Sequence, residues 1–158
     1  MLPPKADVID AFRRTISEEL AAVESVAAMA RDEVSNDETR SEGKYDTRAT
    51  EASYLARGQA ERIVALRRLL SWFETIDPAR FATDVVKIGA LVRLSGDRPS
   101  VVFVAPAGGP RVTVGGTVVQ AISMTSPLGE VLEDLEVEDE LELDTPRGVQ
   151  DLTVAEIA

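Results

Sequence analysis

The chain has 158 residues with a net charge of −11 at pH 7, and it contains neither cysteine nor histidine. Disulfides and zinc sites that need those ligands are therefore excluded, and any bound metal ion must be held by carboxylates. The negative charge argues against binding to a nucleic-acid backbone as the main activity, because phosphate contacts need clustered lysine and arginine. Since no long uninterrupted apolar stretch exists, we expect no secretory signal, no transmembrane span and a cytoplasmic location.

Two segments of about thirty residues carry apolar side chains at alternating steps of three and four residues, the rhythm of a coiled coil. The first stripe consists of Ile9, Phe12, Ile16, Leu20, Val23, Ala27, Ala30 and Val34. The second, which includes one glutamine, consists of Ala52, Leu55, Gln59, Ile63, Leu66, Leu70, Phe73 and Ile76. The polar run from Ser35 to Lys44 is short enough to reverse the chain, which predicts one long antiparallel helical hairpin. Each arm would span roughly 45 Å at ~1.5 Å per residue.

The expected tip of the hairpin is rich in acids. Asp37, Glu38 and Glu42 have no obvious local partner, whereas Asp46 is placed to cap the second helix, and Ser35 and Glu38 have the spacing of a capping box that begins an extra turn. Mg²⁺ prefers oxygen ligands, often one or two carboxylates completed by substrate phosphates and water. Acids at the end of a rod could therefore complete a metal site inside another enzyme, which would make this chain an accessory factor; ordinary solvation of the acids is the alternative.

The composition changes after Pro78, where glycine, proline and β-branched residues replace the alanine, arginine, glutamate and leucine of the first part. A proline cannot extend the preceding helix, so we predict a boundary there and two domains, residues 1–77 and 78–158. Trp72, Phe73 and Ile76, at the base of the second arm, are predicted to pack against the second domain. The apolar runs predicted to form its strands are residues 85–94, 101–105, 112–114, 118–123, 141–143 and 152–157.

Negative charge is concentrated in the second domain. Residues 1–80 hold 12 basic and 15 acidic residues, whereas the remainder holds 5 and 13. Nine of the fifteen residues from Glu130 to Asp144 are acidic and none is basic. Such a run is either a solvated surface that keeps the protein soluble or a contact for a basic partner.

Two short motifs in the second domain contain residues that are typical of a helix start and of a hairpin turn. Ser126 can cap a short helix, and Pro127 would occupy its first turn, where the missing N–H costs nothing. Residues 146–148, Pro-Arg-Gly, suit a hairpin turn, after which apolar alternation resumes at Leu152.

In this order behind a helical hairpin, residues 125–132, 138–143, 145–148 and 152–157 resemble the C-terminal domain of the Gre family of bacterial transcript cleavage factors. The resemblance covers nearly the whole chain. It implies an α+β fold, in which the long antiparallel helical hairpin is followed by a small FKBP-like antiparallel β domain with one short helix.

The chain departs from the family pattern at two places. Glu138 stands where a glycine is usual in the family. The tip, residues 37–46, lacks the family's Asp and Glu three residues apart followed by Asn-Ala-Glu-Tyr. The resemblance is therefore stronger for the second domain than for the tip.

The Gre resemblance implies a monomeric transcription factor that docks on the rim of the RNA polymerase secondary channel through Ser126 and Pro127, with Thr125 beside them. The hairpin would enter that channel, with no direct sequence-specific nucleic-acid binding and no membrane contact. The acids that would reach the active centre are Asp37, Glu38 and Glu42. They would help to hold a Mg²⁺ ion that is shared with the polymerase and not stably bound by the chain alone, so that the polymerase hydrolyses backtracked RNA.

Three other functions stay open. One is a polymerase-binding relative that does not stimulate cleavage. Another is an FKBP-like prolyl isomerase or chaperone, which needs an aromatic-lined pocket, although only Phe81 and Phe103 follow Pro78. The third is a dimeric adaptor in which the helical stripes pair between two chains.

Overall fold

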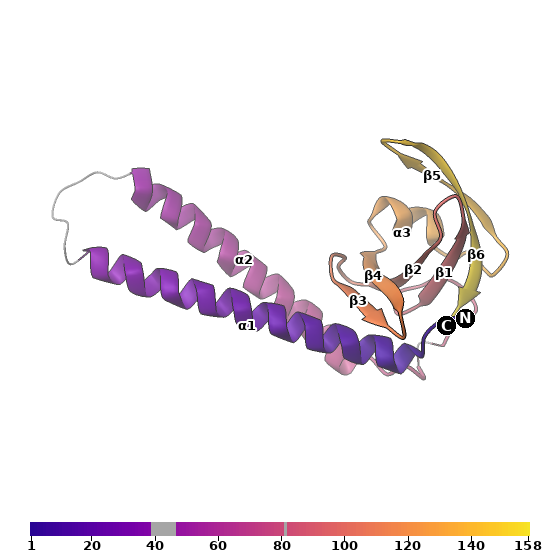
Figure 1. Cartoon of the computed structure of the whole chain (residues 1–158), viewed down its shortest axis with the longest axis horizontal. Coiled ribbons are helices and arrows are strands. Elements are labelled where there is room, and N and C mark those ends of the chain that lie inside the picture. The colour runs from indigo at the N-terminus through magenta and orange to yellow at the C-terminus, as the bar shows by residue number, and fades with distance from the viewer. Residues whose placement is uncertain (39–46, 81) are drawn as a thin grey trace. The chain divides into compact units, whose positions relative to one another are not determined.

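Two long helices precede a six-stranded sheet and one short helix (Figure 1). The structure, a computed structural model, describes residues 1–38, 47–80 and 82–158, and the side chains of these residues except 33–38, 47–50 and 52. The helices are α1 (Lys5–Glu38), α2 (Thr47–Thr75) and α3 (Pro127–Leu132). The strands are β1 (Leu91–Gly96), β2 (Ser100–Ala105), β3 (Arg111–Val114), β4 (Thr117–Ser123), β5 (Glu140–Thr145) and β6 (Gly148–Ile157). The predicted α+β class is therefore confirmed.

The chain divides into two compact units. The sheet unit comprises residues 1–15 and 72–158, and the arm unit comprises residues 16–71. These units differ from the two segments that the change in composition at Pro78 suggests. The sheet unit also includes the first turns of α1 and the last turn of α2. The division into domains of residues 1–77 and 78–158 stays a prediction.

The sheet has the strand order β3-β4-β2-β1-β6-β5. All neighbouring strands are antiparallel except β2 and β4, which run parallel. The predicted antiparallel β domain is confirmed, with this one pair as the exception. A tight turn through Gly115 and Gly116, both with positive φ, folds β3 back on β4 and leaves β3 at the edge, so that β4 lies beside β2.

Both faces of the sheet are covered, which explains why its central strands are apolar almost throughout. One core cluster contains Val92, Val102, Val104 and Val154, together with Leu132 of α3. Successive side chains of a strand point to opposite faces. Residues that alternate with this cluster, such as Leu91, Val101 and Phe103, are also buried, so the opposite face is covered as well.

Aromatic rings from the two long helices pack around Phe103 of β2. The ring centroids of Phe12 and Phe73 lie 5.7 Å and 5.6 Å from that of Phe103, and Trp72 lies 6.2 Å from it. Ile76 is also buried, with an exposed fraction of 5%. For Trp72 and Phe73, the predicted packing of the base of the second arm against the sheet domain is confirmed.

Arg13 of α1 binds the carboxyl end of α2. The last carbonyl groups of a helix lack partners within the helix, and α2 has no basic residue in its last turn. The Arg13 guanidinium donates hydrogen bonds to the carbonyl oxygen atoms of Phe73 at 2.6 Å and Ile76 at 3.4 Å, and to Asp10 at 2.8 Å. This cation therefore fulfils, from another helix, the role that a lysine or arginine usually plays at a helix C-terminus.

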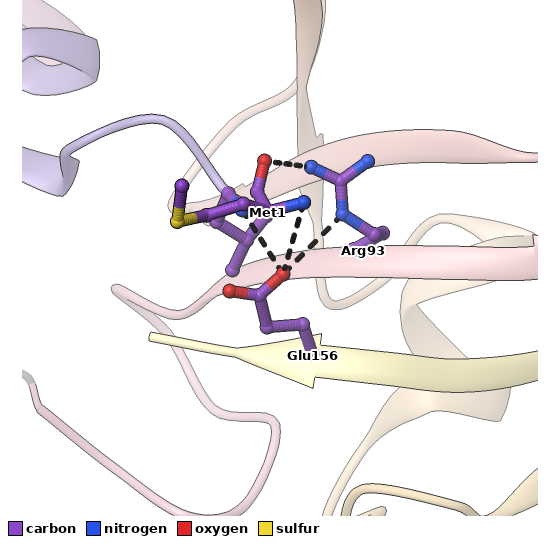
Figure 2. A network of polar contacts seen from close by, with 4 residues as sticks. Met1, Arg93 and Glu156 are labelled. Atoms are coloured by element: carbon purple, nitrogen blue, oxygen red, sulfur yellow. Dashed lines mark hydrogen bonds and ion pairs between the residues drawn. The ribbon is translucent and has the colours of Figure 1, made fainter.

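The two ends of the described chain lie side by side, as Figure 1 shows. The backbone N–H of Leu2 donates to Oε2 of Glu156 at 3.0 Å, and Arg93 on the neighbouring strand binds both that oxygen and the carbonyl oxygen of Met1 (Figure 2). The ammonium group of Lys5 donates to the carbonyl oxygen of residue 158 at 2.9 Å. Burial lowers the pKa of Lys5 to about 8.

Glu138 has a positive φ of 78°, a region that L side chains adopt at a cost. This is the position where the sequence resemblance expects a glycine, and the dihedral angle supplies the physical reason. The residue stays part of the fold, because its N–H donates to the carbonyl oxygen of Val154 at 2.8 Å.

We expect Glu138→Gly to raise the free energy of unfolding of the sheet unit by about 0.5–1 kcal/mol. It removes a cost of about 1–2 kcal/mol, which the flexibility of glycine in the unfolded chain partly offsets. Urea denaturation followed by Trp72 fluorescence would measure it. The matched control is Glu140→Gly in β5, which should destabilise because glycine weakens a strand. Equal destabilisation by the two substitutions would contradict this explanation.

Candidate functional site

The backbone at the predicted tip differs from the sequence expectation. Helix α1 continues to Glu38, so Ser35 lies inside a helix and the predicted capping box at Ser35 and Glu38 is wrong. Asp37 and Glu38 lie in the last turn of α1, and this turn contains no basic residue. Glu42 and the predicted cap Asp46 lie outside the described residues, as do the side chains of Asp37 and Glu38.

The two arms contact each other within one chain, as predicted. Arg67 of α2 binds Glu24 of α1 at 2.6 Å, and Arg62 binds Glu19. The buried stripe residues are Ile9, Phe12, Ile16, Ala27, Ile63, Leu66, Phe73 and Ile76. Those that are half-buried are Leu20, Val23, Ala30, Gln59 and Leu70.

The second stripe fails at one described position. Leu55 is 69% exposed, although the heptad pattern predicts it to be in the seam. Leu69, which was not in the predicted stripe, is only 6% exposed. Adjacent leucines at 69 and 70 make the heptad register ambiguous, and only packing decides between them.

The predicted partner-binding residues gather at the turn between β4 and α3. Ser126 caps α3: its hydroxyl accepts a hydrogen bond from the N–H of Gly129 at 3.1 Å and donates to the carbonyl oxygen of Ser123 at 2.6 Å. The predicted capping role of Ser126 and the first-turn position of Pro127 are confirmed. Ser126 is half-buried, whereas Thr125 and Pro127 on either side of it are exposed.

Gly129 holds this turn close to the sheet. A Cβ atom at residue 129 would lie 2.0 Å from the carbonyl oxygen of Ser123 and 2.8 Å from the Cα atom of Met124. Both are backbone atoms, so no side-chain rotation could relieve the clash. Close approach of the helix to the strand therefore requires glycine, a role that the sequence analysis had not assigned to this residue.

The acidic run from Glu130 to Asp144 is distributed over α3, the following loop and β5. All nine acidic side chains of the run are exposed. One of them has a local role, because Asp139 accepts a hydrogen bond from the N–H of Glu136 at 2.7 Å. On β5, acidic residues alternate with Leu141, which is buried, so the charged side chains of this edge strand face solvent.

Metal and membrane features were sought in the described part of the chain. Residues 1–38, 47–80 and 82–158 contain no group of three or more acidic side chains that could together hold a metal ion, within the side chains described. None of the helices in these same ranges is long and apolar enough to span a membrane.

The aromatic pocket needed for a prolyl isomerase is not formed by Phe103. That ring is fully buried beneath Phe12 and Phe73. Phe81 lies outside the described residues.

No protein-family model and no curated protein match the chain. Similar solved structures include the GreA factor homolog 1 (Gfh1) of Thermus thermophilus, with 23% identity, coverage of 94% of this chain and 95% of that one, and a TM-score of 0.41. Gfh1 of Thermus aquaticus has 22% identity, 94% coverage of both chains and a TM-score of 0.40. The elongation factor GreA/GreB of Nitrosomonas europaea has 23% identity, covers 59% of this chain and 78% of its own, and has a TM-score of 0.37.

Proposed function

We propose that this protein is a Gre-like transcription factor that binds RNA polymerase at its secondary channel. The observation that supports it most is the turn between β4 and α3, where Ser126 and Gly129 fix the backbone while Thr125 and Pro127 stay exposed. A turn whose polar groups are satisfied internally presents a rigid surface, which lowers the entropic cost of binding a partner. The sequence motif that resembles the Gre docking element thus coincides with a preorganised exposed turn.

The paired helices suit the second part of this function, in which the tip approaches the polymerase active centre. Asp37 and Glu38 lie at the carboxyl end of α1, where the helix dipole disfavours negative charge. A divalent cation relieves this repulsion, so these residues fit a site that is completed only with oxygen ligands from the polymerase and its RNA. A bound Mg²⁺ would stabilise the charges that develop during RNA hydrolysis. The protein itself would be an accessory factor in the cytoplasm, not an enzyme.

One observation favours a second candidate, a factor that binds polymerase without stimulating cleavage. Positions 37 and 38 are adjacent in a helix, and adjacent helical positions lie about 100° apart around the axis and do not face each other. Carboxylates three or four residues apart on one helix share a face, and Asp37 and Glu38 do not have this spacing. Binding and cleavage must therefore be measured separately.

We expect Thr125→Arg and Pro127→Ala to weaken binding to core RNA polymerase by about 10-fold or more, because both change the exposed surface of the turn and leave the Ser126 cap intact. Co-sedimentation or pull-down with the purified polymerase would measure this. Arg147→Ala, at the exposed turn between β5 and β6, is the control and should bind as the wild type does. A wild-type protein that does not bind core polymerase would refute the proposed function.

The tip acids should be tested on a stalled elongation complex that contains backtracked RNA. If the protein stimulates cleavage, the triple variant Asp37→Ala, Glu38→Ala, Glu42→Ala should lose that stimulation while its binding to polymerase is retained. Glu51→Ala, at an exposed acidic position on α2, controls for the loss of negative charge. Binding of the wild type without any cleavage would identify the second candidate, and full activity of the triple variant would exclude the metal-binding role of these acids.

A further inference from the structure

The acidic run from Glu130 to Asp144 divides between two faces of the sheet unit. The core cluster on one face of the sheet contains Leu132 of α3 and Leu141 of β5. Since successive side chains of a strand point to opposite faces, Glu142 and Asp144 of β5 point away from the face that α3 covers. The acids of α3 and those of β5 therefore lie on different surfaces and need separate explanations.

The outer side of α3 continues the exposed turn before it. The inner side packs into the core through Leu132, which is fully buried. Pro127 and Val131, four residues apart and therefore on one side of the helix, are both exposed, Val131 to 37%. Glu130, three residues after Pro127, is exposed beside them. Together with Thr125, these exposed residues make up the α3 face.

The α3 face carries negative charge that the described chain does not neutralise. Glu133 and Asp134 follow at the carboxyl end of α3, are exposed, and have no basic residue in the last turn of the helix. Among the side chains that the structure describes, no ion pair involves Glu130, Glu133 or Asp134. Lys87 follows Val86, whose backbone bonds to this segment, but it forms no ion pair with these acids either. Three carboxylates without a neighbouring cation thus border an exposed apolar pair.

The exposed apolar pair distinguishes this part of the acidic run from the part on β5. On β5, exposed acids alternate with inward leucines, as expected for an edge strand that avoids pairing with another chain. On α3, the acids border Pro127 and Val131, beside a turn whose backbone is fixed by Ser126 and Gly129. Solvation explains the first arrangement, whereas an apolar pair on a rigid surface does not help solubility. The α3 face is therefore the part of the run that suits a partner.

We propose that the α3 face binds a basic segment of RNA polymerase in which a lysine or arginine stands beside an apolar side chain. The inference rests on the proposed function, because it names the chemistry that the polymerase surface must have at this turn. Pro127 and Val131 supply the apolar contact, and the carboxylates of Glu130 and Glu133 accept hydrogen bonds from a cation at its rim. Arginine fits best, because its guanidinium donates two bonds to one carboxylate while its aliphatic stem covers apolar surface.

The test is binding of the labelled full chain to core RNA polymerase, measured by fluorescence anisotropy. Glu130→Lys with Glu133→Lys, the α3 variant, should raise the dissociation constant about 10-fold or more, because the reversed charges repel the cation of the partner. The matched control, Glu142→Lys with Asp144→Lys, makes the same charge change in the same run but on the other face of the sheet. It should change the dissociation constant less than about 3-fold at ~0.15 M salt, where exposed charges more than about 8 Å apart are screened. Equal losses in the two variants, or wild-type binding by the α3 variant, would overturn the inference.

Further measurements separate this result from misfolding and from failure of the proposed function. Neither Glu130 nor Glu133 makes a side-chain hydrogen bond or ion pair in the described part of the chain, so the α3 variant should keep the circular dichroism and melting temperature of the wild type. Wild-type binding should weaken as salt is raised, and an affinity that is independent of salt would contradict the proposed contact. A wild type that does not bind polymerase would overturn the proposed function and this inference together. Loss of binding in Thr125→Arg with normal binding by the α3 variant would overturn this inference alone.

Discussion

A fragment that consists of residues 78–158 is expected to lose cooperative folding, although it contains every strand. Its sheet would be without Val8, Ile9, Phe12, Phe73 and Ile76, which are at most 5% exposed in the sheet unit. Full burial of one such side chain contributes about 1.5–3 kcal/mol, so five contribute about 7.5–15 kcal/mol. That sum is comparable to the total stability of a typical domain, about 5–15 kcal/mol. Circular dichroism and urea denaturation of the fragment would show a non-cooperative transition.

The control is the sheet unit itself, with residues 1–15 joined to residues 72–158 by a short Gly-Ser linker. This chain retains the packing of Phe12 and Phe73 against Phe103. It should unfold in one cooperative transition, which Trp72, the single tryptophan of the chain, reports by fluorescence. If the fragment of residues 78–158 unfolds as cooperatively and at the same urea concentration, the helical residues are not part of this core.

Gly129→Ala is expected to destabilise the sheet unit by about 3 kcal/mol or more. The added methyl group would lie 2.0 Å from a backbone oxygen of β4, so either α3 or the strand must move. Overpacking typically costs about 1–3 kcal/mol, and rigid backbone on the opposite side leads to values at the upper end. For a unit of this size each kcal/mol corresponds to a change in melting temperature of about 4–8 °C. Thermal unfolding followed by Trp72 fluorescence measures the change.

Gly58→Ala is the matched control, since it is the same substitution in a helix with open space around it. It should stabilise α2 by up to about 1 kcal/mol, because alanine is the better helix former. The two substitutions should therefore have opposite signs. Destabilisation of similar size by both would mean that the clash at Gly129 is not the cause.

Since Gly129 positions the exposed residues Thr125 and Pro127, its substitution should also weaken any binding through that turn.

Local chemistry allowed much of the fold to be predicted. The heptad spacing of apolar residues predicted both long helices, because this spacing can be recognised from the sequence alone. Ser126 and Pro127 identified the start of α3, because capping uses atoms only a few residues apart. The turn at residues 146–148 was likewise predicted from its proline and glycine, and Gly148 has a φ of 116°.

Errors occurred where the outcome depends on distant residues. The register of the second stripe failed at Leu55 and Leu69, since neighbouring apolar residues give the same pattern in two registers. The parallel pairing of β2 with β4 depends on where β3 lies, and strand sequences alone do not specify the neighbour. Arg13 was missed because its partners at the end of α2 are about sixty residues away in the sequence.

The sequence by itself determined the element types, the lack of cysteine and histidine ligands, and the excess of acidic residues, because composition and short-range spacing suffice for these properties. Only the tertiary structure showed that Phe12 and Phe73 belong to the core of the sheet unit, that Gly129 is required by a close backbone approach, and that Gly58 lines an apolar groove between the two long helices. These features result from packing between residues far apart in the chain. Packing depends on three-dimensional fit, which a one-dimensional pattern of apolar residues does not encode.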